Sequence, residues 1–224
     1  MPDSFMSLID PGAIAIVAGG TVLACAARSG WRDFGGALRQ AGGLLRRQFD
    51  ADANRKALAL AVSSIQREGP HRADPALPPD RQLGMMLETF LRQGSVETLH
   101  AARRTQRALD EARRNSAAQV FSWAGELAPV FGLIGTLFGL TQLAPGNAAS
   151  PSAAIMAAVS TAVLTSLYGA LLAHLLCYPL AGAIERRGID EQRARDVLAE
   201  WFVDQLSRTA MTAQERRAHL RGVA

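Results

Sequence analysis

Between Glu126 and Glu185 the chain runs for 58 residues without an aspartate, glutamate, lysine or arginine. The hydrocarbon core of a membrane takes about 20 apolar residues of helix to cross. The stretch is therefore long enough for two spanning helices, at about 123–143 and 153–184. Residues 144–152, with two prolines, a glycine and an asparagine, predict the turn between them. A buried hairpin in a soluble protein is the alternative, but a chain of 224 residues could hardly cover both helices.

A third apolar stretch, from Pro11 to Ala27, predicts another span near the N-terminus. Phe5, Met6, Leu8 and Ile9 are able to lengthen it. A secretory signal peptide is the alternative, because Ala24-Cys25-Ala26 resembles a cleavage site. The preceding residues, however, include two aspartates and no basic residue, the reverse of a signal peptide's charged start. We therefore expect a retained transmembrane helix.

The basic residues set the expected topology. Of the 24 lysines and arginines, 16 lie in residues 28–119 and eight in residues 185–224. Basic residues gather on the cytoplasmic side of membrane proteins, so both segments are expected there. The N-terminus and the hairpin turn are then expected outside, and the C-terminus inside. The net charge of +4 alone would suggest nucleic acid, but this placement favours a membrane protein.

The predicted fold class is all-α: an integral membrane protein with three transmembrane helices, the last two extended into a cytoplasmic helical region. The expected segments are a first transmembrane helix (1–29), a cytoplasmic helical region (30–119), the transmembrane hairpin (120–185) and a cytoplasmic C-terminal helix and tail (186–224). Apolar spacing predicts helix from Trp31 to Gly69, at 81–93, from Val96 through Ala124 into the membrane, and at 186–209.

The search for reaction chemistry finds nothing specific. No phosphate-binding loop, dinucleotide fingerprint or nucleophile motif is present, and the four histidines and two cysteines lack metal-ligand spacing. We therefore expect neither an enzyme nor a metal site, and no cofactor.

Each hairpin helix carries a stripe of small residues. In the first, Pro129, Gly132, Thr136 and Gly139 share one face; in the second, Ala158, Thr161, Thr165, Gly169 and Ala173 do so. Small residues let membrane helices pack closely, and a membrane threonine often bonds its own helix. Thr136 and Thr161 also lie at matched depth, roughly 12–14 Å from the predicted turn. Two hydroxyls at one level can instead line a polar layer.

These residues resemble the MotA/TolQ/ExbB proton-channel proteins. The resemblance lies in the Ala-Pro start and Gly-Thr-x-x-Gly core of residues 128–139 and in Ser160-Thr161-Ala162, similar to the last span of the TolQ/ExbB branch. Residues 10–21, 169–173 and 179–181 resemble the flagellar stator branch instead. Three spans with an outside N-terminus is the TolQ/ExbB layout.

The resemblance implies a homo-oligomer, a pentamer, in the bacterial inner membrane around a single-span partner of the MotB/TolR/ExbD type. It implies a proton-channel subunit that converts the proton gradient into mechanical work. By resemblance, Thr136 and Thr161 line the proton pathway beside a partner aspartate, with Thr165 or Ser166 as the stator-branch equivalent. Pro129 and Pro179 shape the ends of the spans, and Gly132, Gly135, Gly139 and Gly169 serve helix packing.

Independently, neither the uncharged stretch of 58 residues nor residues 11–27 contain an acidic residue, and proton relay through a membrane normally needs a titratable group. His174 is the internal candidate, although a neutral histidine hydrogen-bonded between subunits is the favoured interpretation. Three alternatives remain. They are a flagellar stator subunit of MotA type, a non-conducting membrane scaffold, and a signal-anchored protein that binds acidic partners through Arg103, Arg104, Arg107, Arg113 and Arg114.

Overall fold

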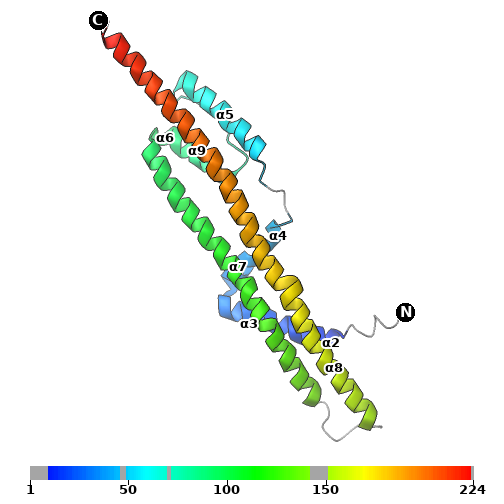
Figure 1. The fold of residues 1–224 in the computed structure, drawn as a ribbon. Coiled ribbons are helices and arrows are strands. Elements are labelled where there is room, and N and C mark those ends of the chain that lie inside the picture. The colour runs from blue at the N-terminus through cyan, green and yellow to red at the C-terminus, as the bar shows by residue number, and fades with distance from the viewer. Residues whose placement is uncertain (1–9, 46–48, 70–71, 142–150, 223–224) are drawn as a thin grey trace. The chain divides into compact units, whose positions relative to one another are not determined.

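The computed structural model describes residues 10–45, 49–69, 72–141 and 151–222 (Figure 1). Every regular element among these residues is a helix, which confirms the all-α prediction. Three stretches are long and apolar enough to cross a membrane, in Pro11–Ser29, Leu99–Thr141 and Ile155–Arg208. Residues 5–9 and most of the expected turn, 144–150, lie outside the described residues.

Two predicted helices agree closely with the structure. Helix α6 spans Arg81–Gln93, and α7 runs unbroken over Val96–Thr141. The helical region predicted from Trp31 to Gly69 consists of two helices, α4 (Trp31–Gly43) and α5 (Ala51–Glu68), and the break between them was not predicted. Two glycines end α4, and the Asp50 carboxylate begins α5 by accepting from the Ala53 N–H at 2.9 Å.

The other spans contain π-helices, which the sequence did not predict. The first is α2 (Pro11–Ile14), the π-helix η1 (Ala15–Gly19) and α3 (Gly20–Ser29). The last is α8 (Pro151–Leu171), the π-helix η2 (Leu172–Cys177) and α9 (Tyr178–Gly222). Helix α9 is thus both the end of the last span and the predicted C-terminal helix.

The chain divides into two compact units, and α7 and α9 each contribute to both. The first unit comprises residues 1–46 and 113–186, and the second comprises 47–112 and 187–224.

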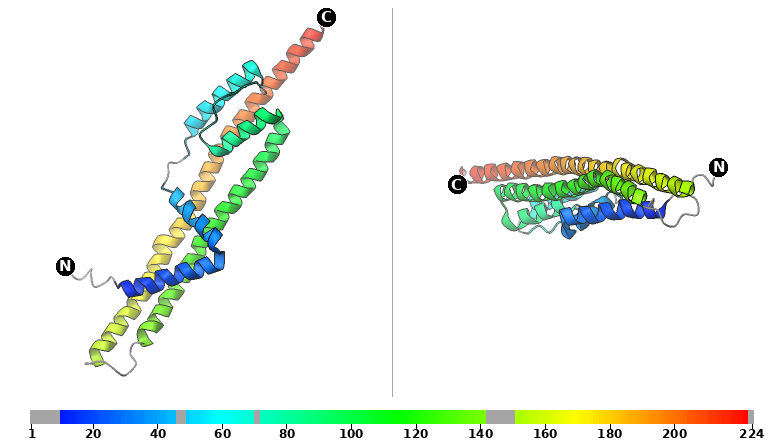
Figure 2. Two further views of the ribbon diagram at one scale, coloured as in Figure 1. Left: turned by 180° about the vertical axis from the view of Figure 1, so that it is seen from behind. Right: turned by 90° about the horizontal axis from the view of Figure 1, so that it is seen from below.

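In the first unit, α2, η1 and α3 pack against the hairpin formed by α7 and α8, which run side by side in both views of Figure 2. The backbone N–H of Asp10 donates to the Tyr168 hydroxyl on α8 at 3.2 Å. Near the other end of this span, the Cys25 thiol donates to the Val120 carbonyl at 3.3 Å. These two bonds attach both ends of the first span to the hairpin helices.

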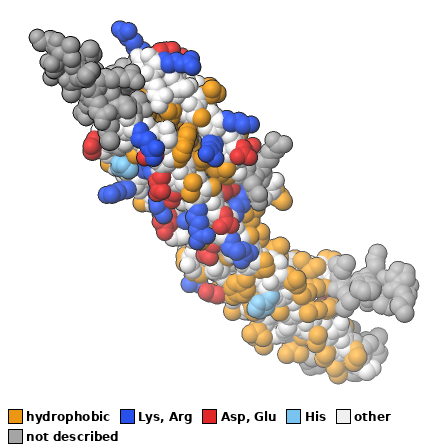
Figure 3. All heavy atoms as spheres, turned by 45° about the horizontal axis from the view of Figure 1, so that its top comes forward, with side chains coloured by type: hydrophobic (Ala, Val, Ile, Leu, Met, Phe, Trp, Pro, Cys, Tyr) orange, Lys and Arg blue, Asp and Glu red, His pale blue; other side chains and the backbone are white. Residues whose placement is uncertain are grey.

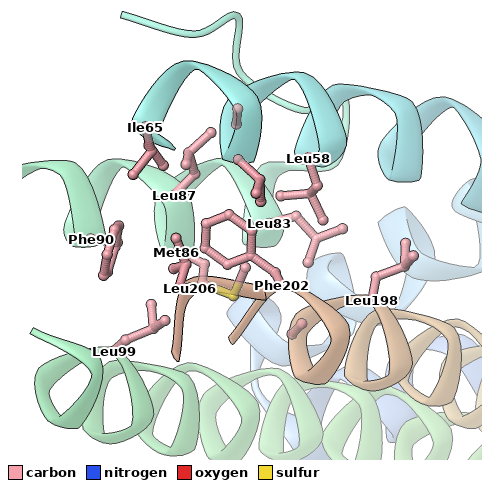
Figure 4. Packing of buried hydrophobic residues seen from close by; sticks show 13 residues of the cluster. Leu58, Ile65, Leu83, Met86, Leu87, Phe90, Leu99, Leu198, Phe202 and Leu206 are labelled. Carbon is pink, nitrogen blue, oxygen red and sulfur yellow. The ribbon is translucent and has the colours of Figure 1, made fainter. Parts of the chain in front are cut away.

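The second unit has an aliphatic and aromatic core between α5, α6, α7 and α9 (Figure 4). The rings of Phe90 and Phe202 meet edge to face, with centroids 6.1 Å apart. At the edge of the core, Asp80 caps α6 by accepting from the N–H groups of Gln82 and Leu83. Its other oxygen accepts from Arg195 of α9 at 2.9 Å. One carboxylate thus starts a helix and connects it to a neighbour.

Many large apolar side chains on the two hairpin helices are exposed on the surface of the first unit. The most exposed are Leu133, Leu137, Met156, Val163 and Leu175, each more than 60% exposed. In Figure 3 one part of the surface shown is mostly hydrophobic and almost free of charged side chains. A soluble monomer rarely exposes so large an apolar patch. This exposure fits a membrane and not the alternative of a hairpin buried in a soluble fold.

Candidate functional site

The two hairpin helices approach one another at glycines. A Cβ built on Gly169 of α8 would lie 2.7 Å from the carbonyl oxygen of Ala128 and 3.2 Å from the Cα of Pro129. One built on Gly132 would lie 2.9 Å from the carbonyl oxygen of Thr165. The nearest atoms here are backbone atoms, so only glycine fits without moving a helix. The small-residue stripes therefore place backbone against backbone, as in other closely packed membrane helices.

Thr165 lies inside this packing. Its side chain is fully buried, and a Cβ built on Gly135 would come within 2.7 Å of it. Its hydroxyl donates to the Ala162 carbonyl of its own helix at 2.9 Å. Within one subunit, therefore, Thr165 fills the space beside Gly135 and its donor is used. Ser166, the neighbouring candidate, is exposed instead.

Thr136 and Thr161, the pair expected at one depth, are both partly exposed. The methyl group of Thr161 lies against Gly139, 3.7 Å from a Cβ built there, and Gly139 is less than one turn along α7 from Thr136. The structure therefore places the two threonines within about one helical turn of each other along the hairpin. Their hydroxyls differ, because that of Thr136 donates to the Leu133 carbonyl at 2.6 Å. The Thr161 hydroxyl has no hydrogen-bond partner among the described residues.

The two predicted shaping prolines lie in α7 and in α9, the helix that continues α8 beyond η2. Pro129 lies inside α7, and its backbone contacts the glycine face of α8. Pro179 is the second residue after η2, and the N–H of the intervening Tyr178 donates to the Ala173 carbonyl, five residues back. Proline has no N–H to donate and displaces the carbonyl one turn earlier. The π-helix lies where the last span must accommodate that displacement.

The sequence did not point to Tyr178, which directly precedes Pro179. Its ring is 5.4 Å from the His174 ring, centroid to centroid. A Cβ built on Gly125 of α7 would lie 2.8 Å from the Tyr178 ring. Tyr178 therefore packs against α7 while His174 remains exposed. An aromatic residue directly before a membrane proline was the available signal.

The family model for the MotA/TolQ/ExbB proton channel family matches residues 79–196. A structure of C. jejuni MotAB matches with a TM-score of 0.76 and 18% identity, over 91% of this chain and 80% of that chain. The flagellar MotAB stator complex from Bacillus subtilis matches with a TM-score of 0.72 and 22% identity, over the same shares. No curated protein matches. At these identities the solved structures show a shared fold.

Proposed function

The chain belongs to the MotA/TolQ/ExbB proton channel family, and from that membership we propose that it is the channel subunit of a proton-driven, energy-transducing complex of the bacterial inner membrane. Several identical copies, a pentamer by the family resemblance, surround a single-span partner that carries an aspartate. Proton movement between ring and partner drives relative motion of the two. The basic segments face the cytoplasm, and the N-terminus faces the periplasm.

The observation that carries the proposal is the state of Thr161. It lies in a stretch without Asp, Glu, Lys or Arg, and its hydroxyl has no partner among the described residues. An unsatisfied polar group in hydrocarbon costs several kcal/mol, which favours a partner outside the subunit. A threonine hydroxyl can donate to a carboxylate and orient water. The hydroxyl of Thr161 is therefore suited to bind a carboxyl group, which the uncharged stretch of this chain does not supply.

Thr136 supports the same role from the facing helix. Its hydroxyl already donates to its own helix, but the oxygen can still accept a hydrogen bond. One free donor and one free acceptor within about one helical turn of each other suit a water or a carboxylic acid. Thr165 is proposed as a packing residue that holds this layer in place.

The test compares threonine variants in complex with the partner. Thr161→Val replaces the hydroxyl with a methyl group of similar size, and we expect at least a tenfold loss of proton flux with the oligomer intact. Thr136→Val is expected to lose flux as well. Thr161→Ser keeps a hydroxyl and should retain flux. Thr141→Val is the matched control, because the Thr141 hydroxyl also donates to its own helix, at 2.7 Å to Phe138.

Normal flux in both Thr161→Val and Thr136→Val would contradict the lining role. It would favour the second candidate, a non-conducting membrane scaffold, for which the glycine packing alone matters. The process that the complex drives is a separate proposal. We propose TolQ/ExbB-like envelope energisation, and a MotA-type flagellar stator is the alternative. The neighbouring reading frame discriminates, since a partner's outer domain indicates the structure on which the motor acts.

A further inference from the structure

His174 stands apart from its surroundings in the last span. It is the one histidine in the 58 residues without charged groups, and Glu185 lies about 16 Å farther along the helix. Its imidazole is exposed, and its described contact is with the Tyr178 ring. No hydrogen bond from the imidazole to another described residue is present. The ring therefore brings one donor and one acceptor into an apolar helix without satisfying either.

The backbone carbonyl of His174 is also without its usual donor. In an α-helix it would accept from the N–H of residue 178, and in a π-helix from that of residue 179. The Tyr178 N–H donates to Ala173 instead, and Pro179 has no N–H. The carbonyl and the imidazole of this one residue are thus both unpaired, within the π-helix η2.

Two unpaired polar groups are costly in lipid, where each costs several kcal/mol. Unsatisfied backbone at membrane depth is tolerated where it lines water or is buried in protein. The first charged residues beyond the spans on neighbouring helices are Glu126 of α7 and Arg28 of α3, and these pair with each other at 3.5 Å. Because Glu126 and Arg28 pair with each other, neither serves as a hydrogen-bond partner of His174. Water in the assembled channel is the occupant that satisfies a donor and two acceptors together.

We propose that His174 forms a water-binding proton-relay site in the half of the channel between the threonine layer and the cytoplasm. This inference rests on the proposed function. A proton arrives on the free ring nitrogen of the neutral imidazole, and the proton of the other nitrogen leaves to a water held by the His174 carbonyl. No net charge stays on the ring after one transfer, and rotation of the exposed ring about its side-chain bonds restores the starting arrangement without returning the proton. Ser166, also exposed and without a described partner, lies about 12 Å nearer Thr161 along the helix.

The test uses the full complex in liposomes with an imposed pH difference. His174→Phe removes the ring nitrogens, and His174→Gln keeps hydrogen bonding but cannot carry a proton on a ring. Both are expected to lower proton flux at least tenfold with oligomer and partner retained, as judged by native mass spectrometry. Pro179→Ala supplies the missing N–H and should lower flux by severalfold. Tyr178→Phe, which keeps the ring contact, and His100→Gln, in the second unit, are controls expected near the wild-type rate.

The outcomes separate the two proposals. Absence of flux in the wild-type complex would overturn the proposed function. Wild-type flux with both His174 variants within twofold of it would overturn the relay alone. Loss of flux in His174→Phe but not in His174→Gln would also overturn it, since hydrogen bonding would then suffice. Loss of the oligomer in both variants would assign His174 to subunit packing instead.

Discussion

Gly169→Ala is expected to separate the two hairpin helices. The new methyl carbon would lie 2.7 Å from the Ala128 carbonyl oxygen, whereas ordinary contacts begin at 3.4 Å. The neighbouring atoms belong to the α7 backbone and cannot rotate away, so the helices must part by about 0.7 Å locally. Overpacking of this kind typically costs 1–3 kcal/mol. We expect the free energy of unfolding to fall by about 2 kcal/mol, about 30-fold in the folding equilibrium.

The assay is reversible unfolding in mixed micelles with rising dodecyl sulfate, followed by circular dichroism. Gly19→Ala is the matched control, because it also lies in a membrane helix and a Cβ built there meets no atom within 4 Å. That control should unfold at or above the wild-type midpoint, since alanine favours helix over glycine by about 1 kcal/mol. A Gly169→Ala midpoint equal to that of wild type would refute the close approach of α7 and α8.

Two further predictions concern the second unit. Phe202→Ala should lower the free energy of unfolding by about 3–5 kcal/mol, because the ring is fully buried against Phe90. Leu60→Ala, at a side chain 68% exposed, should lower it by less than about 1 kcal/mol, with both variants measured by urea titration. Equal effects of the two would contradict the described core. Asp80→Asn keeps a helix cap but weakens the pair with Arg195, and should cost about 0.5–1 kcal/mol. Asp80→Ala also loses the cap and should cost about 1 kcal/mol more in thermal unfolding, and an unchanged melting temperature would exclude the capping role.

The parts predicted well from sequence were those where one physical signal dominates. The stretch without charge between Glu126 and Glu185 has few uses besides crossing a membrane. Helix α6 has one strongly apolar face and begins at an aspartate, so both its existence and its bounds could be read. The break between α4 and α5 was missed because apolar spacing continues across Gly42 and Gly43, which periodicity alone does not weigh.

The site was less predictable, for a related reason. Within an apolar span every face is apolar, so periodicity cannot show a π-helix or which hydroxyl points at the neighbouring helix. Thr161 and Thr165 lie on one stripe, yet Thr165 is buried against Gly135 while Thr161 keeps a free hydroxyl. That difference depends on where the glycines of α7 lie opposite α8. The difference between the two threonines becomes visible when α7 and α8 are packed together in the structure.

The most direct test of the account is whether proton flux depends on a second polypeptide. The chain is reconstituted into liposomes alone, with its single-span partner, and with that partner carrying Asn in place of its membrane aspartate. The account predicts dissipation of an imposed pH difference by the chain with its intact partner, and by neither of the other two preparations. Flux through the chain alone, or equal flux with the Asn variant, would contradict the claim that the acid comes from the partner.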